Sequence, residues 1–236
     1  MIAAVDSRIP SAARRELERR GFEVLLMPPH PALPKNVASH PDLLFFVSKD
    51  TVYTTRSYFQ IAETEIKRLT YCSNRNLWLC SEELGEAYPQ DILLDAAPIG
   101  HWLICHPKHT AKKLLDCYGE MIIPVRQGYA KCSCVPISEH ALITSDPSVG
   151  NAAERNGIEV LRIREGDIRL DGYSTGFIGG ASSYCPDGTV SDLYFCGQLT
   201  SHPNGRVIEE FCRQYGKNAV SLGDFPLTDI GTIFLL

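Results

Sequence analysis

Residues 141–163 read ALITSDPSVGNAAERNGIEVLRI, and this stretch decides the fold. Its opening ALIT is an uncharged run that predicts a buried strand, and the closing IEVLRI predicts another. Between them stand Pro147, whose fixed φ suits the start of a helix, and Gly157, which can take the left-handed conformation that ends one. The stretch therefore predicts a strand, a short helix and a returning strand.

Three further copies of this pattern occupy residues 2–27, 101–125 and 193–222. In each of the four copies a proline precedes a glycine by 10 to 13 residues, a separation that fits a helix of about two to three turns. The pairs are Pro10 with Gly21, Pro107 with Gly119, Pro147 with Gly157, and Pro203 with Gly216. The sequence therefore predicts a strand–helix–strand unit that repeats along the chain.

A fifth and less regular copy lies in residues 39–80. SHPDLLFFVSKDTVYTTR predicts strand, turn and strand, SYFQIAETEIKRL predicts a helix, and NLWLC predicts the returning strand. Asn74 and Asn76 stand where the other copies have the terminal glycine. We expect one of them to make that turn.

The complete copies begin with an additional strand joined by a hairpin. Residues 128–146 and 176–197 each predict strand, polar turn and strand, with turns at residues 138–140 and 186–188. The first copy lacks such a strand, whereas LTDIGTIFLL at residues 227–236 gives a strand with no helix after it. We therefore predict an α/β fold of five ββαβ units in one domain, residues 1–236, closed by pairing of the N- and C-terminal strands. The alternative is an open α/β sandwich.

This organisation resembles the pentein, or guanidine-modifying-enzyme, superfamily over essentially the whole chain. Short phrases such as LITSDPSV and QLTSHPNG carry the resemblance, and QGYAKC, the His-Pro step and PLTDIG look like an uncharacterised bacterial branch of that fold. The resemblance implies a five-bladed α/β propeller with ligands on its axis. The superfamily contains arginine-modifying hydrolases and amidinotransferases, and also a non-catalytic ribosomal anti-association factor.

Composition excludes several other classes of function. The chain has 44% apolar and 22% charged residues and a formal net charge of -5, so we expect no nucleic-acid or membrane partner. No signal peptide or spanning segment is visible, and nine cysteines among apolar neighbours predict reduced thiols, so we expect a cytoplasmic protein. The arginines at 14, 15, 19 and 20 fit the solvated face of one helix.

Polar residues near the inner strand ends are the natural site candidates in this architecture. The strand–proline junctions offer Asp6, Arg8, His106, Asp146 and His202. The starts of the hairpin strands offer Asp42, Asp95, Lys131, Cys132 and Asp229.

The resemblance implies a cysteine nucleophile near the C-terminus, a histidine, and carboxylates that hold a guanidinium group. LTDIGTIFLL contains no cysteine, so the usual thiol mechanism is in doubt. Cys132 and Cys134 remain as thiols; on a regular strand both point to one face, and Lys131 points to the other. Each is either a core cysteine or a nucleophile. A zinc site there would need His106 or His202, and we expect no metal.

The other candidates have structural alternatives. His202 is either a proton donor or a residue of a helix entrance, and Asp146 is either a ligand-binding carboxylate or a helix N-cap. Ring closure would place Asp229 near Asp6, where two carboxylates suit a cation or an acid/base pair; ordinary turn chemistry is the alternative.

The glycine-rich stretch GYSTGFIGGASS at residues 172–183 lacks the spacing of a dinucleotide fingerprint and opens no helix, so we expect no cofactor. Gly179 and Gly180 predict a close approach of two backbones near the axis.

Together these patterns predict an axial site for a polar, guanidino or amino-acid-like compound. We assign catalytic roles to His202, Cys132 and Asp146 and binding roles to Asp6, Lys131 and Asp229. Hydrolysis or group transfer at a carbon–nitrogen bond is the reaction that the resemblance implies. The alternative is a non-catalytic protein whose ring is a rigid platform for a partner. The sequence leaves open whether the protein is an enzyme, and its oligomeric state.

Overall fold

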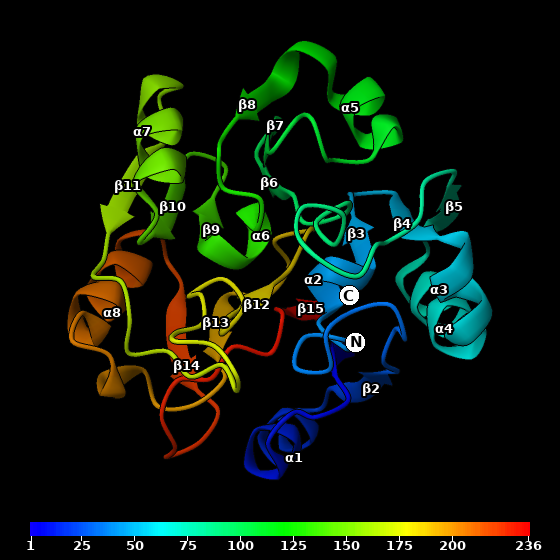
Figure 1. The fold of residues 1–236 in the computed structure, drawn as a ribbon. Helices are drawn as coiled ribbons and strands as arrows, with labels where there is room; N and C mark the ends of the chain where they lie inside the picture. Colours follow the sequence, from blue (N-terminus) through cyan, green and yellow to red (C-terminus); the bar gives the residue numbers. More distant parts are fainter.

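The computed structural model describes residues 1–236, and its strands form five separate sheets. Each sheet contains at least one parallel pair of strands joined through a helix, as the repeat predicts. Figure 1 shows these units arranged around a common centre, with the longer helices on the outside. The fold is therefore a mixed α/β arrangement of repeated units.

The elements follow the chain in this order. The first unit has β1 (Ile2–Asp6), α1 (Ser11–Arg19) and β2 (Glu23–Met27). The second has α2 (Pro41–Leu44), β3 (Phe45–Val47), β4 (Thr51–Thr55), α3 (Arg56–Ile61), α4 (Glu63–Ser73) and β5 (Asn76–Cys80). The third has β6 (Ala97–Ile99), β7 (Trp102–Cys105), α5 (Lys112–Tyr118), the 3-10 helix η1 (Gly119–Met121) and β8 (Ile122–Pro124).

The fourth unit has α6 (Ala130–Ser133), β9 (Cys134–Ser138), β10 (Ala141–Thr144), α7 (Pro147–Arg155) and β11 (Glu159–Arg162). The fifth has β12 (Ser183–Tyr184), β13 (Asp192–Phe195), the 3-10 helix η2 (Leu199–Ser201), α8 (Gly205–Gln214) and β14 (Asn218–Ser221). The chain ends with β15 (Ile233–Leu235).

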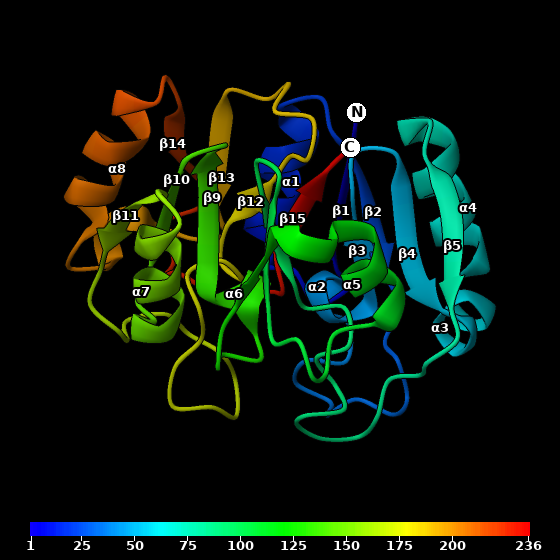
Figure 2. The same ribbon diagram turned by 90° about the horizontal axis from the view of Figure 1, so that it is seen from above.

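The two ends of the chain pair as the sequence predicts. β15 runs antiparallel to β1, with Ala3 opposite Leu235 and Ala4 opposite Phe234. Figures 1 and 2 both place the two termini side by side, near the middle of the view in Figure 1 and at its upper edge in Figure 2. The C-terminal strand thus supplies the first unit with the antiparallel strand that the chain's beginning lacks, although no single sheet encircles the molecule.

The glycines that end the predicted helices have the backbone conformation that the repeat requires. Gly21, Gly119, Gly157 and Gly216 all have positive φ, and Asn74 takes their place in the second unit with φ 52°. The prolines are less regular: Pro147 begins α7, but α5 begins five residues after Pro107 and α8 two residues after Pro203, because a turn intervenes. The helix predicted in the second unit is two helices, broken at Ala62.

Two segments predicted as strand starts are short helical turns, α2 and α6. In α6 the Ser133 amide donates to Tyr129 O at 2.9 Å, and Cys134 Sγ donates to Ala130 O at 3.1 Å. The hairpin from β12 to β13 is also only partly formed: β12 pairs with β15, and a single bridge, Ser182 to Phe195, links it toward β13.

Apolar side chains fill the space between the sheets and the helices. The largest cluster combines β3, β4 and α4 with Phe234 of the last strand, whose ring centroid lies 4.9 Å from that of Phe45. All nine cysteines are free, as predicted, although Cys72 and Cys117 are exposed rather than in the core. No helix has the length and apolarity needed to span a bilayer.

Candidate functional site

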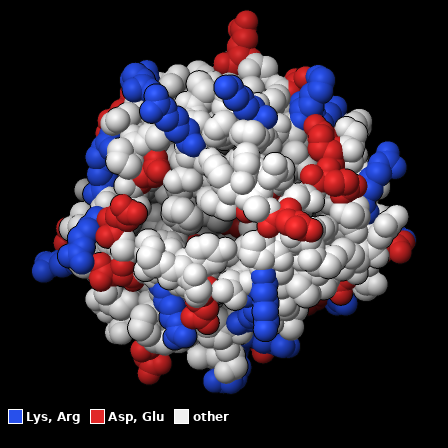
Figure 3. All heavy atoms as spheres, viewed as in Figure 1, with Lys and Arg blue, Asp and Glu red and all other residues white.

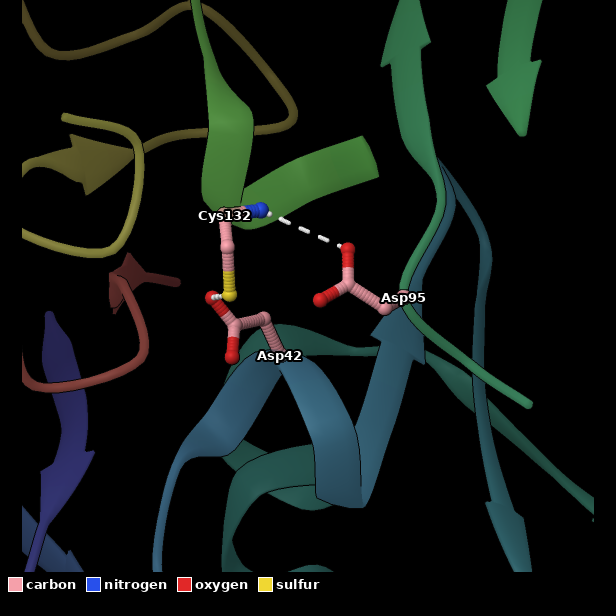
Figure 4. Close-up of side chains that lie close together, drawn as sticks. All are labelled: Asp42, Asp95 and Cys132. Atoms are coloured by element: carbon pink, nitrogen blue, oxygen red, sulfur yellow. Dashed lines mark hydrogen bonds between the residues drawn. The ribbon is translucent and has the colours of Figure 1, made fainter. Parts of the chain in front are cut away.

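Three short segments, each just ahead of an antiparallel strand, bring buried polar side chains together (Figures 1 and 4). α2 carries Asp42, α6 carries Cys132, and Thr232 directly precedes β15. Cys132 Sγ donates to Asp42 Oδ2 at 2.9 Å, and Thr232 Oγ1 donates to the same oxygen at 2.8 Å. One carboxylate oxygen therefore ties together three units that are far apart in sequence.

Asp95, from the segment ahead of β6, adds a second carboxylate. Its Oδ1 accepts from the backbone amides of Lys131 at 2.5 Å and Cys132 at 3.3 Å; Figure 4 draws the second of these. Asp42 Oδ1 and Asp95 Oδ2 are buried and have no hydrogen-bond partner. A buried acceptor without a donor costs about 1–3 kcal/mol, so both oxygens favour a bound proton or an N–H donor.

Lys131 brings a positive charge to the same cluster. Its side chain is fully buried, its Nζ donates to Thr232 Oγ1 at 3.1 Å, and the ammonium lies 5.4 Å from the centroid of the Tyr184 ring. The prediction that Lys131 and Cys132 point to opposite faces is wrong, because residues 130–133 form a helical turn and not a strand. Both side chains reach the network around Asp42.

A buried histidine connects this cluster to two further carboxylates. His40 Nε2 lies 3.7 Å from Asp6 Oδ2, and His40 Nδ1 lies 3.9 Å from Asp229 Oδ1. Asp229 also accepts from the backbone amides of Phe177 at 2.8 Å and Gly231 at 3.0 Å. Asp6 and Asp229 thus lie near each other, as the sequence predicts, with the His40 imidazole between them.

Burial dominates the ionisation of these groups. It raises the pKa of Asp42, of Asp229 and, well above its usual range, of Asp95, where the Asp42 charge adds to the effect. The pKa of the Cys132 thiol is raised strongly, first by burial and then by the charges of the three carboxylates. Burial lowers the pKa of His40. The cluster is therefore short of positive charge.

Gly179 and Gly180 allow the last two units to approach this closely, and the predicted backbone approach is confirmed. A Cβ at Gly179 would lie 2.3 Å from Lys131 O, and one at Gly180 would lie 2.0 Å from Asp229 Oδ1. The Gly180 amide donates to Cys132 O at 3.0 Å. Any side chain here would separate α6 from Asp229.

Asp229 also borders the cavity that reaches this cluster from outside. The cavity has a volume of about 470 Å³, and its polar lining is Asp6, Arg8, Ser11, Asn36, Arg169, Asp171, Thr228 and Asp229. Figure 3 shows a face hollowed near its middle, with acidic and basic side chains interspersed. On the other side of the cluster, the void beside Asp42 and Lys131 has no room for a water molecule. Access is thus through the Asp229 side.

The chain matches the profile of a family of unknown function, DUF6873, over residues 4–234. It belongs to this family. No curated protein matches the sequence.

Two solved structures resemble this DUF6873 protein. DDAH from Pseudomonas aeruginosa, a cysteine-to-serine variant complexed with citrulline, has a TM-score of 0.54 at 9% identity and covers 93% of this chain and 90% of its own. SxtG, an amidinotransferase from Microseira wollei in the saxitoxin biosynthetic pathway, has a TM-score of 0.50 at 10% identity and covers 93% and 87%. The DUF6873 chain therefore has the pentein, or guanidine-modifying-enzyme, fold.

The DUF6873 fold does not bring every predicted residue to the centre. Asp146 caps α7, because its Oδ1 accepts from the Val149 amide at 2.9 Å, and its Oδ2 accepts from Gln127 Nε2. His202 ends η2, where its Nδ1 accepts from the Asn204 amide at 3.0 Å. Neither contacts Asp42, Asp95 or Cys132. His106 lies in a different cleft.

Two residues of the DUF6873 site were missed in the sequence. His40 stands in SHPDL, which matches the SHPNG around His202, so the His-Pro step was a usable signal. Thr232 has φ 68°, a rare conformation for a β-branched residue, and nothing in the sequence TDIGTIF predicts it. It stands near the place where the resemblance implies a cysteine.

A metal ion is one group that the DUF6873 cluster could hold, although the sequence predicts none. Asp42, Asp95 and Cys132 offer ligand atoms within 4.8 Å of one another. However, the Lys131 ammonium donates to the Thr232 hydroxyl, which itself donates to Asp42 Oδ2. The positive charge of Lys131 therefore opposes the binding of a divalent cation here. The two free oxygens are equally suited to the N–H groups of an organic cation.

Proposed function

We propose that the protein binds an amino-acid-like cation, with a guanidino compound as the best match, at Asp229 in the 470 Å³ cavity. The single observation that carries this proposal is the position of Asp229. Its carboxylate belongs to the buried cluster and also borders the cavity, and no Lys or Arg side chain lies within 4 Å of it. A cation entering the cavity would supply the missing charge.

The cavity's other groups fit the remainder of an amino acid. Arg8 and Arg169 line it, each already beside one carboxylate, so an entering carboxylate would meet two guanidinium groups near Asn36. A volume of 470 Å³ is within the usual range of small-molecule sites, which is about 300–1,000 Å³. A zwitterion with a cationic end therefore matches this lining best.

We further propose that reaction occurs at a carbon–nitrogen bond, with Cys132 as the nucleophile. Cys132 does not line the cavity, so this step requires the centre to open between Asp229 and Cys132. The Cys132 proton would then pass to Asp42 along the existing hydrogen bond, and the thiolate would attack the guanidinium carbon. As the C–S bond forms, the C–N bond to the amine breaks and the amine takes the proton from Asp42. Water or an acceptor amine would then release the cysteine. The likeness to DDAH complexed with citrulline and to the amidinotransferase SxtG supports this class of reaction.

Asp95, Lys131 and Asp6 have positioning roles in this proposal. Asp95 fixes the backbone of α6, Lys131 holds Thr232 against Asp42, and Asp6 flanks His40. His202 and Asp146 receive no role, because each side chain accepts from a backbone amide of its own segment, away from the cluster.

The binding step is tested by calorimetric titration of the protein with L-arginine, L-citrulline and L-norleucine. Arginine should bind, and norleucine should not. D229N should weaken arginine binding about tenfold or more, because a charge-assisted contact is lost. D171N, which changes a carboxylate at the exposed edge of the same cavity, is the control and should bind arginine almost normally. Equal affinities of wild type and D229N would contradict the proposal.

Proton release gives a second readout of the same site. Because burial raises the pKa of Asp229, a cation at this carboxylate should lower that pKa and, at a pH where part of the Asp229 carboxyl is protonated, displace a proton. The apparent binding enthalpy should then depend on the ionisation enthalpy of the buffer, and this dependence should disappear in D229N.

Catalysis is tested separately by incubation with guanidino compounds and mass spectrometry of the products. C132S should abolish turnover while arginine still binds, and C134S should retain turnover, because Cys134 bonds only Ala130 O within its own turn.

A second candidate function is non-catalytic binding, and one observation favours it. The Cys132 thiol is closed off and its raised pKa keeps it protonated. Binding of arginine without turnover in wild type would favour this alternative over the enzyme.

We also propose that residues 1–236 form one domain whose five units make a closed five-bladed ring. The pairing of β1 with β15 supports ring closure. Nine free cysteines support a reducing compartment such as the cytoplasm.

A further inference from the structure

A second cleft lies away from the central cluster, between α7 and the segments that follow β7 and β8. Its volume is about 770 Å³. Its polar and charged lining is His106, Lys108, His109, Arg126, Ser148, Asn151 and Arg155. No Asp or Glu lines it, although the whole chain carries a net charge of -5. The cleft therefore concentrates positive charge in an acidic protein.

The three full cations of this cleft have no carboxylate partner. Lys108, Arg126 and Arg155 are exposed, and none lies within 4 Å of an acidic side chain, whereas most other arginines of the chain do. In Figure 3 basic side chains gather over α7 and β8, in the upper left of the view. These guanidinium groups are free to bind an oxyanion through paired N–H donors.

The walls of the cleft are held in place by the backbone. The Arg126 amide donates to Ser148 Oγ at 3.0 Å and joins the end of β8 to the first turn of α7. On the opposite side, the amides of His109 and Thr110 donate to His106 O and close a turn. The binding groups thus start from a preformed frame.

The histidine and asparagine side chains of the cleft can also donate hydrogen bonds to an acceptor. The rings of His106 and His109 lie 4.7 Å apart, and His106 Nδ1 is buried without a partner. Asn151 Oδ1 accepts from Arg162 Nη2 at 2.7 Å, so its amide N–H groups remain available as donors. The nearby Asp146 carboxylate is occupied by the Val149 amide and by Gln127. No carboxylate lines the cleft to favour a cation.

We propose that this cleft binds a compact, multiply charged oxyanion, such as a phosphate-bearing or polycarboxylate metabolite. Arg126 and Arg155 approach from two different elements, so a ligand with two anionic groups would engage both. This site is independent of the cation site at Asp229, since the two cavities share no residue.

The test is thermal unfolding and calorimetric titration of the full chain with pyrophosphate, citrate and inorganic phosphate, each against chloride at equal ionic strength. Pyrophosphate or citrate should raise the melting temperature in a saturable way and bind more tightly than phosphate. A larger effect of pyrophosphate would identify phosphate groups as the preferred chemistry, and a larger effect of citrate would identify carboxylates. No response beyond that of chloride to any of the three would overturn the proposal.

The decisive variant is R126Q/R155Q, whose exposed positions should leave folding intact. It should lose about tenfold to a hundredfold in affinity, because two charge-assisted contacts disappear. The matched control is R15Q/R213Q, which removes two exposed and unpaired arginines from α1 and the last turn of α8. Equal losses in both double variants would show a general charge effect and would overturn the site.

H109Q is a second variant that changes no arginine. It should weaken binding several-fold while circular dichroism and the ligand-free melting temperature stay unchanged. Unaltered affinity in both H109Q and R126Q/R155Q would place any anion elsewhere.

Discussion

The hydroxyl of Thr232 donates a hydrogen bond of 2.8 Å to the carboxylate of Asp42, although 190 residues separate the two in sequence. The same hydroxyl accepts from Lys131 Nζ at 3.1 Å, and the same carboxylate oxygen accepts from Cys132. Thr232 makes these contacts with φ 68°, a conformation that costs a β-branched residue free energy. The hydrogen bonds around Asp42 therefore hold Thr232, the residue before the C-terminal strand, in a strained backbone conformation.

Removing this hydroxyl should destabilise the protein more than its size suggests. T232V keeps the shape of the side chain but leaves Lys131 Nζ without its hydrogen-bond acceptor and removes one of the two donors to Asp42 Oδ2, at a cost of about 2–3 kcal/mol in the free energy of unfolding. T232S keeps the hydroxyl and should remain within about 1 kcal/mol of wild type. Urea unfolding monitors both, and a T232V protein as stable as T232S would show that the network contributes nothing.

The substitution G180A should disrupt the site through the steric clash of the added Cβ alone. The added Cβ would lie 2.0 Å from Asp229 Oδ1 and 2.5 Å from its Cγ, so Asp229 must move. We expect G180A to lose about 1–3 kcal/mol of stability and most of its arginine binding. G188A is the control, because Gly188 has positive φ but no atom within 4 Å of an added Cβ. G188A should be destabilised by about 1–2 kcal/mol with unchanged binding, whereas full binding by G180A would contradict this prediction.

The repeat explains how much of the fold the sequence could predict. A glycine or asparagine with positive φ ends a helix in each unit because few other residues take that conformation at low cost, so this punctuation is visible in the sequence. The pairing of β1 with β15 follows from counting strands within the repeat. The first signal lies in single residues of the sequence, and the second follows from the number of strands in each copy of the repeat.

The site could be predicted only in part, because its geometry depends on tertiary contacts. Asp42, Asp95, Lys131, Cys132 and Asp229 were found from their equivalent places in the repeat. The helical turn that points Lys131 and Cys132 the same way has only four residues, and amide contacts with Asp95 stabilise it from another unit. No local pattern encodes such a turn.

The buried carboxylates should make stability fall as pH rises. Because burial and the Asp42 charge raise the pKa of Asp95, the folded protein holds this proton more tightly than the unfolded chain does. The contribution of Asp95 to the free energy of unfolding is complete below about pH 4. Above that pH it decreases, by up to about 1.4 kcal/mol per pH unit, until the pH reaches the pKa of Asp95 in the folded protein. D95N removes this loss and keeps an oxygen to accept from the Lys131 and Cys132 amides.

The stability of D95N relative to wild type should therefore increase between pH 4 and pH 7. Urea unfolding of both proteins across this range measures the difference. Burial lowers the pKa of His40, so the contribution of His40 to the stability of the protein decreases toward low pH. This decrease occurs in both proteins and cancels from the comparison. A difference that stays constant with pH would show that Asp95 is ionised in the folded state throughout.

Thiol labelling should separate Cys132 from the surface cysteines. Cys132 is 3% exposed and its pKa is raised strongly by burial and by three carboxylates, so the free protein presents neither an accessible sulfur nor a thiolate. Iodoacetamide at pH 8 should label the exposed Cys72 and Cys117 first, with Cys132 slower by on the order of a hundredfold or more, at a rate set by local opening. Peptide mass spectrometry follows each site, and Cys134, buried with a pKa raised to about 12, is the internal reference for a closed thiol. Labelling of Cys132 as fast as that of Cys72 would mean that the centre opens freely and that the thiol is already activated before any ligand arrives.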